Sequence, residues 1–411
     1  MIDGISRWLL SRFLRRIVRG SLTVVEDGER RTYGSGPPAA TIVVRSARMW
    51  RMGLTGSRGL ADAYGAGLWD SPDLIALVQL AARNASGLDR IRARLALVRV
   101  PFQRVRGRLE RSTRRRRRRD IAAHYDLGNE LFSRMLDASM TYSCALFEEP
   151  AMTLEEAQVA KLELICEKLG VRPGDHLLEI GTGWGAFAVH AALTRGCRVT
   201  TTTISREQYA YAVAAVCRAG VEDHVTVLLE DYRDLSGRYD KLVSIEMIEA
   251  VGWRHTGAFL SKCSELLAPD GAMLLQAIVI DDRAYEVEKA SRSFMNTLIF
   301  PGGCLPSLEV IARGAARRTD MQLVHVEDLT PHYVETLRWW RRRFVEHAPE
   351  LDDLGYDERF RRLWTLYLSY CEAGFAERRI LDLQLMLGKP GRRVEAPAAA
   401  TGPPRAMVAL P

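Results

Sequence analysis

The chain after residue 120 predicts an α/β fold with a doubly wound parallel sheet, and three observations support this. Short runs rich in Val, Leu, Ile and Thr alternate with longer segments of helical apolar period. Two of the longer segments open on helix-capping residues. The first short run, His176–Ile180, leads directly into a glycine-rich turn and another helical segment. This rhythm is typical of a sheet that carries helices on both faces.

The predicted elements follow in order from Thr153. Thr153 and Glu156 form the Thr-x-x-Glu pattern of a capping box, so a helix is expected to begin there. Ser205 is a preferred N-cap residue and begins a later helix. The expected helices are Thr153–Leu169, Gly185–Thr194, Ser205–Ala219 and His255–Leu267, and the expected strands are His176–Ile180, Arg198–Thr203, Val225–Leu229, Lys241–Ile245 and Ala272–Val279.

A small α+β domain is expected over residues 1–83, ahead of this sheet. Two β-type runs, Leu22–Val25 and Thr41–Val44, lie among glycine turns. A helix is expected over Ser71–Ala82, with Ser71 as its N-cap and proline at its first position. The chain therefore divides into a small first domain and a larger second one.

Residues 1–19 predict an amphipathic helix with one basic side. Arg12, Arg15, Arg16 and Arg19 recur at helical spacing, and apolar residues cover the other side. The apolar side either packs on its own domain or lies on anionic lipid, since a basic face opposite aromatic and aliphatic residues suits both roles. The sequence leaves both readings open.

The net charge of +7 comes from one short stretch of the chain. From Arg99 to Arg119 there are eleven arginines and one acid, a charge of +10, so the rest of the chain carries about −3. Because like charges repel, residues 84–119 are expected to be an extended linker between the domains. The run Arg114–Arg119 suits anionic lipid head groups, with nucleic acid or a plain solvated linker as alternatives. A nucleic-acid partner is not expected, because the segment offers one aromatic residue, Phe102, for base stacking.

The cysteines and the termini bear on the compartment. Seven cysteines are scattered without a Cys-x-x-Cys pair, which argues against a disulfide framework or a zinc site and for a reducing compartment. No signal-peptide pattern begins the chain, so a cytoplasmic location is expected. The Pro- and Ala-rich residues 391–411 are expected to be a disordered tail.

The candidate cofactor site is the Glu-x-Gly-x-Gly-x-Gly run Glu179–Gly185. Glycines let the backbone turn sharply out of a strand and approach a ligand with no Cβ in the way. The spacing differs from that of a dinucleotide site, and the second strand continues as Thr203–Gln208 without the acid that such a site needs. The pattern is the form found in class I methyltransferases, and it predicts S-adenosylmethionine as the ligand.

Several strings of this chain resemble the cyclopropane-fatty-acyl-phospholipid synthases, a family of class I S-adenosylmethionine-dependent methyltransferases. The resemblance covers residues 120–390 and extends more weakly into the first domain, through Gly59–Trp69. It is nearest to the plant enzymes and to actinobacterial relatives that form 10-methylene and tuberculostearic (10-methyl) chains. The strings are His124–Phe132, Met140–Cys144, Leu178–Gly185, Asp231–Asp234, Glu246–Gly252, Ile299–Ser307 and Pro331–Tyr333.

The resemblance implies a role for each matching residue. It implies a class I methyltransferase sheet with helical insertions that cover a lipid pocket. It also implies that S-adenosylmethionine is surrounded by Tyr142, Ser143, Glu179, Gly181, Thr182, Gly183, Gly185, Thr203, Ile204, Gln208, Tyr232 and Arg233.

A second set of residues matches the family's catalytic positions. Cys144, Glu249, Ile278 and Tyr333 match positions around a bound bicarbonate ion. Gln276 stands where the family usually has histidine. An amide hydrogen-bonds an anion but carries neither a proton nor a positive charge, so this difference bears on the product. A sixth residue, Cys371, matches a cysteine considered as a nucleophile, and it is the weaker candidate because the chemistry needs no covalent enzyme intermediate.

The activity that the resemblance implies is transfer of a methyl carbon to the cis double bond of an unsaturated phospholipid acyl chain. A carbocation forms, and bound bicarbonate removes a proton to close a cyclopropane ring. The alternatives are a 10-methylene product, which a reductase partner would turn into a methyl branch, a methyltransferase for a free small lipid, and a non-catalytic lipid-binding relative. The resemblance also implies a homodimer bound peripherally to the inner face of the membrane.

Overall fold

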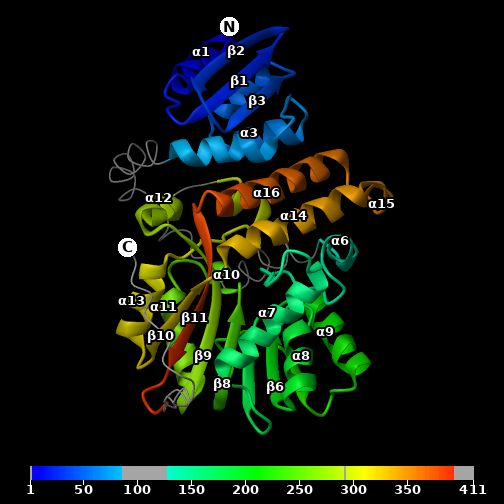
Figure 1. Cartoon of the computed structure of the whole chain (residues 1–411), viewed down its shortest axis with the longest axis vertical. Coiled ribbons are helices and arrows are strands. Elements are labelled where there is room, and N and C mark those ends of the chain that lie inside the picture. Colours follow the sequence, from blue (N-terminus) through cyan, green and yellow to red (C-terminus); the bar gives the residue numbers. More distant parts are fainter. Residues whose placement is uncertain (1, 86–126, 291–292, 393–411) are drawn as a thin grey trace, which may run out of the picture.

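Two sheets organise the computed structural model, which describes residues 2–85, 127–290 and 293–392 (Figure 1). The small sheet has four strands in the order β2-β1-β3-β4, and β1 pairs antiparallel with β2 and parallel with β3. The large sheet has seven strands in the order β10-β11-β9-β8-β5-β6-β7. The predicted linker and tail fall largely outside the described residues.

The small sheet and its helices come first in the chain. The two predicted strands are present, and two more polar or shorter strands complete the sheet. The strands are β1 (Gly20–Glu26), β2 (Glu29–Ser35), β3 (Ala39–Val44) and β4 (Trp69–Asp70), and the helices are α1 (Ile2–Leu14), α2 (Arg48–Gly53), α3 (Ser57–Gly65) and one over residues 74–85.

Two predictions for this region need correction. The helix expected over residues 1–19 ends at Leu14, before the last basic residues. The helix expected from Ser71 begins later, and its cap is Asp73, whose Oδ1 accepts a hydrogen bond from the backbone N–H of Ala76 at 2.9 Å. A carboxylate near the first turn also interacts favourably with the helix dipole, which makes Asp73 the better cap.

The large sheet is doubly wound, as predicted. Leu177 and Leu178 on β5 belong to the apolar cores on opposite faces of the sheet, because successive side chains of a strand alternate. The predicted strands are present, three with the predicted bounds. The strands are β5 (His176–Ile180), β6 (Arg198–Thr203), β7 (Val225–Leu229), β8 (Tyr239–Ile245), β9 (Leu267–Ile280), β10 (Gln322–Asp328) and β11 (Ile380–Gly388).

The sheet is not wholly parallel, which corrects the sequence prediction. Strands β5 to β9 pair in parallel, but β11 inserts antiparallel between β9 and β10. Neither β10 nor β11 was predicted. β11 does carry a strand-like alternation, with Asp382 and Gln384 between leucines, and this signal was missed, whereas β10 is largely exposed and shows no clear alternation.

The helices around the large sheet follow the predicted caps. Thr153 and Glu156 form the predicted capping box of α7, and Ser205 caps α9 by accepting from the N–H of Gln208. The helices are α6 (Asn129–Met135), α7 (Leu154–Leu169), α8 (Ala186–Arg195), α9 (Arg206–Ala219), α10 (Ile248–Val251), α11 (Thr256–Leu266), α12 (Tyr285–Ala290), α13 (Leu308–Arg318), α14 (Thr330–Glu346), α15 (Ala348–Asp353) and α16 (Glu358–Ala376), with a 3₁₀ turn η1 (Asp282–Ala284) and a π-helical turn η2 (Met295–Ile299).

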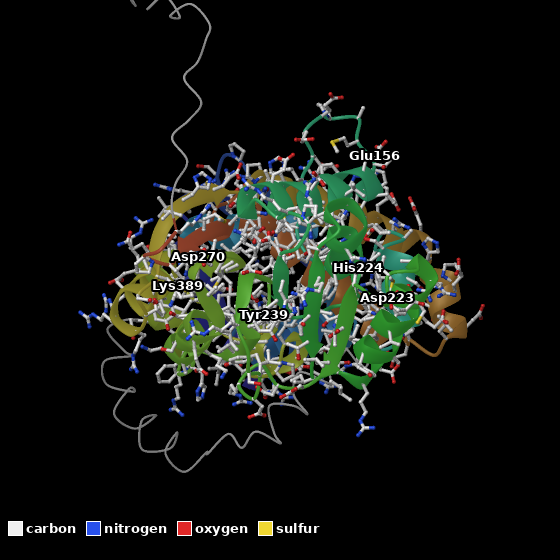
Figure 2. All side chains as sticks on the ribbon, turned by 90° about the horizontal axis from the view of Figure 1, so that it is seen from below. Glu156, Asp223, His224, Tyr239, Asp270 and Lys389 are labelled. Carbon is white, nitrogen blue, oxygen red and sulfur yellow. The ribbon has the colours of Figure 1, made fainter. Side chains whose placement is uncertain are left out.

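The strand order places a crevice at the carboxyl ends of β5 and β8. The chain runs outward from β5 to β6 and β7 on one side and through β8 to β9 on the other, so the connections diverge there. Ligands of open α/β sheets bind at such a switch point. Figure 2 shows the opposite edge, where His224 and Tyr239 lie at the starts of β7 and β8.

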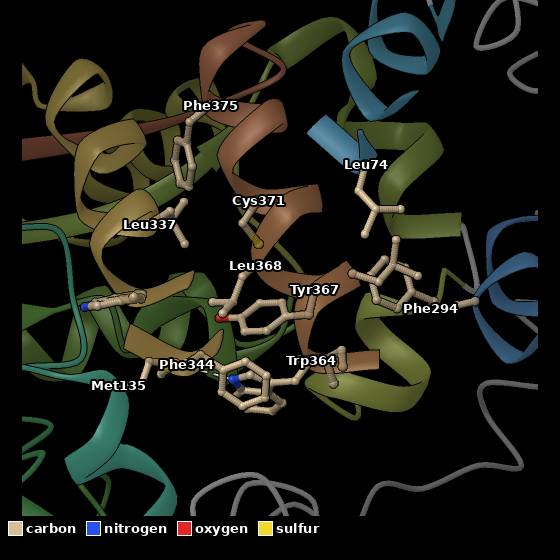
Figure 3. Packing of buried hydrophobic residues seen from close by; sticks show 14 of the residues in the cluster. Leu74, Met135, Phe294, Leu337, Phe344, Trp364, Tyr367, Leu368, Cys371 and Phe375 are labelled. Atoms are coloured by element: carbon tan, nitrogen blue, oxygen red, sulfur yellow. Dashed lines mark hydrogen bonds between the residues drawn. The ribbon is translucent and has the colours of Figure 1, made fainter. Parts of the chain in front are cut away.

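Helices α14 and α16 cross the molecule between the two sheets (Figure 1). Their facing sides are apolar and aromatic, and Trp364, Tyr367 and Phe344 pack together there (Figure 3). α16 also joins the small sheet to the rest of the molecule, because the guanidinium of Arg362 donates to the carbonyl of Tyr64 at 2.7 Å. No helix in the described parts of the chain is both long enough and apolar enough to span a bilayer.

Candidate active site

A cavity of about 180 Å³ opens at the switch point. Its walls are the ends of β5, β6 and β8, the turns that follow them, and the segment before α7. Eleven of the twelve predicted cofactor-binding residues line it: Tyr142, Ser143, Glu179, Gly181, Thr182, Gly183, Thr203, Ile204, Gln208, Tyr232 and Arg233.

The glycine turn needs its glycines for three different reasons. All three have positive φ, at 105° for Gly181, 54° for Gly183 and 97° for Gly185. A Cβ on Gly181 would come within 3.2 Å of Met247, whereas one on Gly183 would meet no atom within 4 Å. Gly185 does not line the cavity, which differs from the prediction. A Cβ there would come within 3.3 Å of Ala212, so this glycine lets α8 approach α9.

Glu179 anchors the floor of the cavity at the end of β5. Its Oε2 accepts a hydrogen bond from Thr201 Oγ1 at 2.6 Å, and Thr201 lies 2.7 Å from the hydroxyl of Thr182. Burial raises the pKa of the Glu179 carboxyl to about 8. A carboxyl held this far from water gains from a hydrogen-bond donor or a positive charge on a ligand.

The ends of β6 and β7 form the opposite wall. Thr203 Oγ1 donates to Gln208 Oε1 at 2.8 Å, which fixes that amide beside the cavity. Arg233 lies within 5.8 Å of the centre of the Tyr232 ring and forms a two-point ion pair with Asp231. This ion pair holds the side chain of Arg233 in place, where it lines the cavity.

The segment before α7 lines the cavity on the side that contacts α16. The hydroxyls of Tyr142 and Tyr367 lie 2.7 Å apart, which links the cavity to α16. Ser143 Oγ accepts a hydrogen bond from the ammonium of Lys161 at 2.8 Å, and Lys161 is fully buried. Sequence analysis did not identify Lys161, because a lysine inside a helical pattern has the usual appearance of a solvated residue.

The chemistry of the cavity lining suits S-adenosylmethionine. The open side of Gly183 lets a ligand approach the backbone. The lining is mostly apolar with a few polar groups and four carboxyl groups, those of Glu179, Glu230, Asp231 and Glu246, which suit a ligand with a sulfonium charge.

Behind the cavity, Glu246 joins the predicted catalytic residues into one network. It follows β8 directly and lines the cavity wall. Its Oε1 accepts from the backbone N–H of Cys144 at 2.8 Å and from the amide of Gln276 at 3.0 Å. Its Oε2 accepts from the hydroxyl of Tyr333 at 2.6 Å. Glu246 begins one of the strings that resemble the family, but the resemblance assigns it no role. The sequence therefore did not predict the centre of this network.

Two more carboxyl groups lie beside this one. Gln276 donates its second amide hydrogen to Asp382 Oδ2 at 2.9 Å, and its own oxygen accepts from Gln384 at 3.1 Å. Glu249 Oε1 accepts from the backbone N–H of Ile278 at 2.5 Å. Among the described residues, Glu249 Oε2 and Asp382 Oδ1 are buried without a hydrogen-bond partner. Such oxygens are costly unless they are protonated or face a ligand.

Burial and mutual repulsion set the charges of the three acids. Burial, and then the charge of Glu246, raises the pKa of Glu249 to about 8. Burial and the charges of Glu246 and Glu249 raise the pKa of Asp382 well above its usual value. Burial also raises the pKa of Glu246, but its three donors and the Lys161 ammonium oppose this. Glu246 is therefore the member of the cluster whose surroundings favour the negative charge.

The two predicted cysteines lie in different settings. Cys144 contributes its backbone N–H to the network, while its buried thiol is held protonated because burial raises its pKa well above the usual value. Cys371 lies on α16 among Leu337, Leu368 and Phe375 (Figure 3). Burial raises the pKa of its thiol too, which opposes the thiolate that a nucleophile needs.

The family model described as mycolic acid cyclopropane synthetase matches residues 112–385. Over 377 residues, 89% of this chain and 88% of the relative, the chain is 37% identical to the tuberculostearic acid methyltransferase of Mycobacterium tuberculosis. Over 262 residues, 64% of this chain and 65% of the relative, it is 42% identical to the cyclopropane-fatty-acyl-phospholipid synthase of Escherichia coli K12.

Solved structures agree with these matches. The cyclopropane synthase MmaA2 of Mycobacterium tuberculosis superposes with a TM-score of 0.62 at 33% identity, over 66% of this chain and 98% of that one. The mycolic acid cyclopropane synthase CmaA1, solved with SAH and CTAB, gives a TM-score of 0.62 at 32% identity, with the same shares covered.

Proposed function

Because this chain belongs to the mycolic acid cyclopropane synthetase family and is an S-adenosylmethionine-dependent methyltransferase, we propose that it methylates the cis double bond of an unsaturated phospholipid acyl chain. One observation carries the proposal. The cofactor cavity shares Glu246 with a carboxylate network, and aromatic side chains of α14 and α16 contact residues of both. An alkene reaction that passes through a carbocation needs this combination of a dry, apolar cover and nearby negative charge.

S-Adenosylmethionine, when bound, supplies a methyl group on a positively charged sulfur. A cis alkene has no acidic proton, so the residues of the chain contribute chiefly by orientation and by excluding water. Proximity and orientation of this kind contribute roughly 7–11 kcal/mol to lowering a barrier. Tyr142, Trp340 and Tyr333 present aromatic rings in contact with one another beside the cavity wall. Such rings exclude water and face a cation favourably.

The expected bicarbonate ion does not fit the donors that the resemblance assigns to it. The N–H of Cys144, the amide of Gln276 and the hydroxyl of Tyr333 already donate to Glu246, and the N–H of Ile278 donates to Glu249. A further anion would also face three buried carboxyl groups. For this reason no step of the reaction is assigned to bicarbonate.

The product expected from the sequence is a cyclopropane ring. A second candidate is an exocyclic methylene group, which a reductase would convert into a methyl branch. The similarity to the tuberculostearic acid methyltransferase, which extends over 89% of the chain, favours this second candidate. The amide of Gln276, which cannot carry a positive charge, also sets this site apart from the histidine form.

The membrane contact is proposed for α1. Leu10 packs on the small sheet, whereas Ile5, Trp8 and Phe13 on the same helix are exposed. Exposed aromatic and aliphatic side chains beside arginines suit an anionic bilayer surface. The run Arg114–Arg119 lies outside the described residues, and its role at head groups, the homodimer and the reductase partner stay predictions.

The test uses the purified full chain, S-adenosylmethionine and vesicles of cis-unsaturated phospholipid. Release of S-adenosylhomocysteine is expected with these vesicles and not with saturated ones. Proton NMR of the recovered lipid distinguishes cyclopropyl from vinylidene protons. Cofactor binding without any release of S-adenosylhomocysteine would contradict the proposal and support the non-catalytic alternative.

A further inference from the structure

We infer that the carboxylate of Glu246 takes the place of bicarbonate and is the base that removes a proton from the alkylated acyl chain. The inference rests on the proposed function. It assigns a catalytic role to a residue that the family resemblance did not single out, and it predicts that the activity of this chain is independent of bicarbonate.

The hydrogen-bond donors around Glu246 are already engaged by carboxylates of the chain. Tyr333 has one hydroxyl hydrogen, Cys144 has one backbone N–H, and the amide of Gln276 has two hydrogens. All four hydrogens point to carboxylates of the chain, three to Glu246 and one to Asp382. A carboxylate and bicarbonate both present two oxygens on one planar carbon. Glu246 therefore satisfies the donors that an external bicarbonate ion would need.

The backbone at Glu246 is in a strained conformation. Glu246 has a φ of +48°, and it is one of only four non-glycine residues in the described ranges with positive φ. A residue with a side chain is strained in this left-handed region. Its N–H donates to the carbonyl of Gln276 at 2.9 Å, which holds the strained position against β9. Strained residues that a structure keeps in place occur preferentially at functional sites, and this one directs its carboxylate to the cavity edge.

The surrounding charged groups favour one negative charge, located on Glu246. The neighbouring acids Glu249 and Asp382 tend to hold their protons, because the charge of Glu246 adds to the effect of burial. Burial lowers the pKa of Lys161 and the charge of Glu246 opposes this, so the two groups favour each other's charged form. One negative charge at Glu246 is therefore compatible with the site, whereas an added anion would be repelled.

The step balances within the reaction already proposed. The bond between sulfur and the methyl carbon breaks as a bond forms between that carbon and one alkene carbon, and the other alkene carbon becomes cationic. Glu246 takes a proton from the new methyl group. The electron pair of that C–H bond closes the ring or, after a hydride shift, forms a methylene double bond. The proton stays on the Glu246 carboxyl until the product leaves and solvent accepts it.

The experiment measures turnover of the purified full chain in buffers stripped of carbon dioxide, with and without added sodium bicarbonate. Wild-type release of S-adenosylhomocysteine is expected to change less than about twofold on addition. Glu246→Gln keeps the shape but not the charge, and it is expected to lower kcat by at least about 100-fold, the usual contribution of a general base. Its Kd for S-adenosylmethionine is expected to rise by much less, no more than about tenfold, because Glu246 also lines the cofactor cavity.

A second variant guards against a merely structural effect. Glu246→Gly suits the positive φ, so it is expected to fold, and it opens the space of the carboxylate. Added bicarbonate or formate is expected to restore at least a tenth of the wild-type rate to this variant and to leave the wild type unchanged. If neither bicarbonate nor formate restored the rate of Glu246→Gly, the result would count against the inference.

The inference is overturned if the stripped wild-type enzyme is inactive and recovers with bicarbonate, or if Glu246→Gln turns over at more than a tenth of the wild-type rate. Failure of the proposed function is a separate result. In that case the chain binds S-adenosylmethionine but transfers no carbon to the lipid under either condition, and the inference falls with it.

Discussion

The two ends of the site are built in different ways. The cofactor end comes from short contiguous segments, Glu179–Gly185 and Thr203–Gln208, and uses backbone conformation and small side chains. The carboxylate end gathers single side chains from β9, β11, α10, α14 and the residue directly after β8. The first end therefore depends mainly on residues that are close together in the sequence, whereas each member of the second end depends on partners far away in the chain.

The largest expected effect breaks the cofactor end alone. Gly181→Val places a branched side chain at a φ of +105° and against Met247. The Kd for S-adenosylmethionine is expected to rise by about 100-fold or more, equivalent to about 2.7 kcal/mol. Isothermal titration calorimetry checks this. The matched control is Gly196→Val, which also has positive φ but has open space around its Cβ, and it is expected to bind normally.

The next effect breaks the carboxylate end alone. Tyr333→Phe removes the hydroxyl that donates to Glu246 at 2.6 Å. A hydrogen bond to a charged group contributes about 1.5–3 kcal/mol, so kcat is expected to fall by about 10-fold to 100-fold with little change in cofactor Kd. Tyr356→Phe, which loses a hydrogen bond to the Leu127 carbonyl, is the control. A loss of cofactor affinity in Tyr333→Phe equal to its loss of kcat would show that the two ends are not separable.

Most residues predicted for the cofactor end line one cavity, because their signals in the sequence are local. The glycine turn, the caps at Thr153 and Ser205, and most strand positions follow from neighbouring residues. Glu246 and Asp382 could not be assigned in this way. Their proximity depends on the pairing of β11 with β9, and β11 itself was not predicted. The antiparallel insertion is a tertiary choice that no local pattern records.

A pH series sharpens the comparison, since each end holds a buried acid. Burial raises the pKa of both Glu179 and Glu249 to about 8 in the folded chain. A raised carboxyl pKa means that the folded state binds the proton more tightly than the unfolded state. The resulting stability is present at low pH and is lost as pH rises through about 8. The melting temperature is therefore expected to fall by several degrees from pH 6 to pH 9.

Variants assign this pH effect to the two acids. Glu179→Gln and Glu249→Gln are each expected to flatten the fall in melting temperature, and Glu265→Gln, at an exposed position, is expected to leave it unchanged. A slope that neither buried variant alters would mean that other groups control the stability in this range.

The smallest effect lies outside both ends. Trp8 and Phe13 on α1 are 59% and 40% exposed, and their replacement by alanine removes apolar area from the proposed membrane contact. Co-sedimentation with anionic vesicles is expected to fall by about 10-fold, at roughly 1.4 kcal/mol. Turnover of detergent-dispersed lipid is expected to persist. Leu54→Ala, exposed but outside α1, is the control, and an equal loss of binding in that variant would contradict the role of α1.

The central claim is that this site moves one carbon onto an acyl double bond and then takes a proton from that same carbon. S-Adenosylmethionine with a fully deuterated methyl group tests it directly, with mass spectrometry of the recovered phospholipid. The account predicts an acyl chain that has gained one carbon and two deuterium atoms. An acyl chain of unchanged mass, or one that retains all three deuterium atoms, would contradict it.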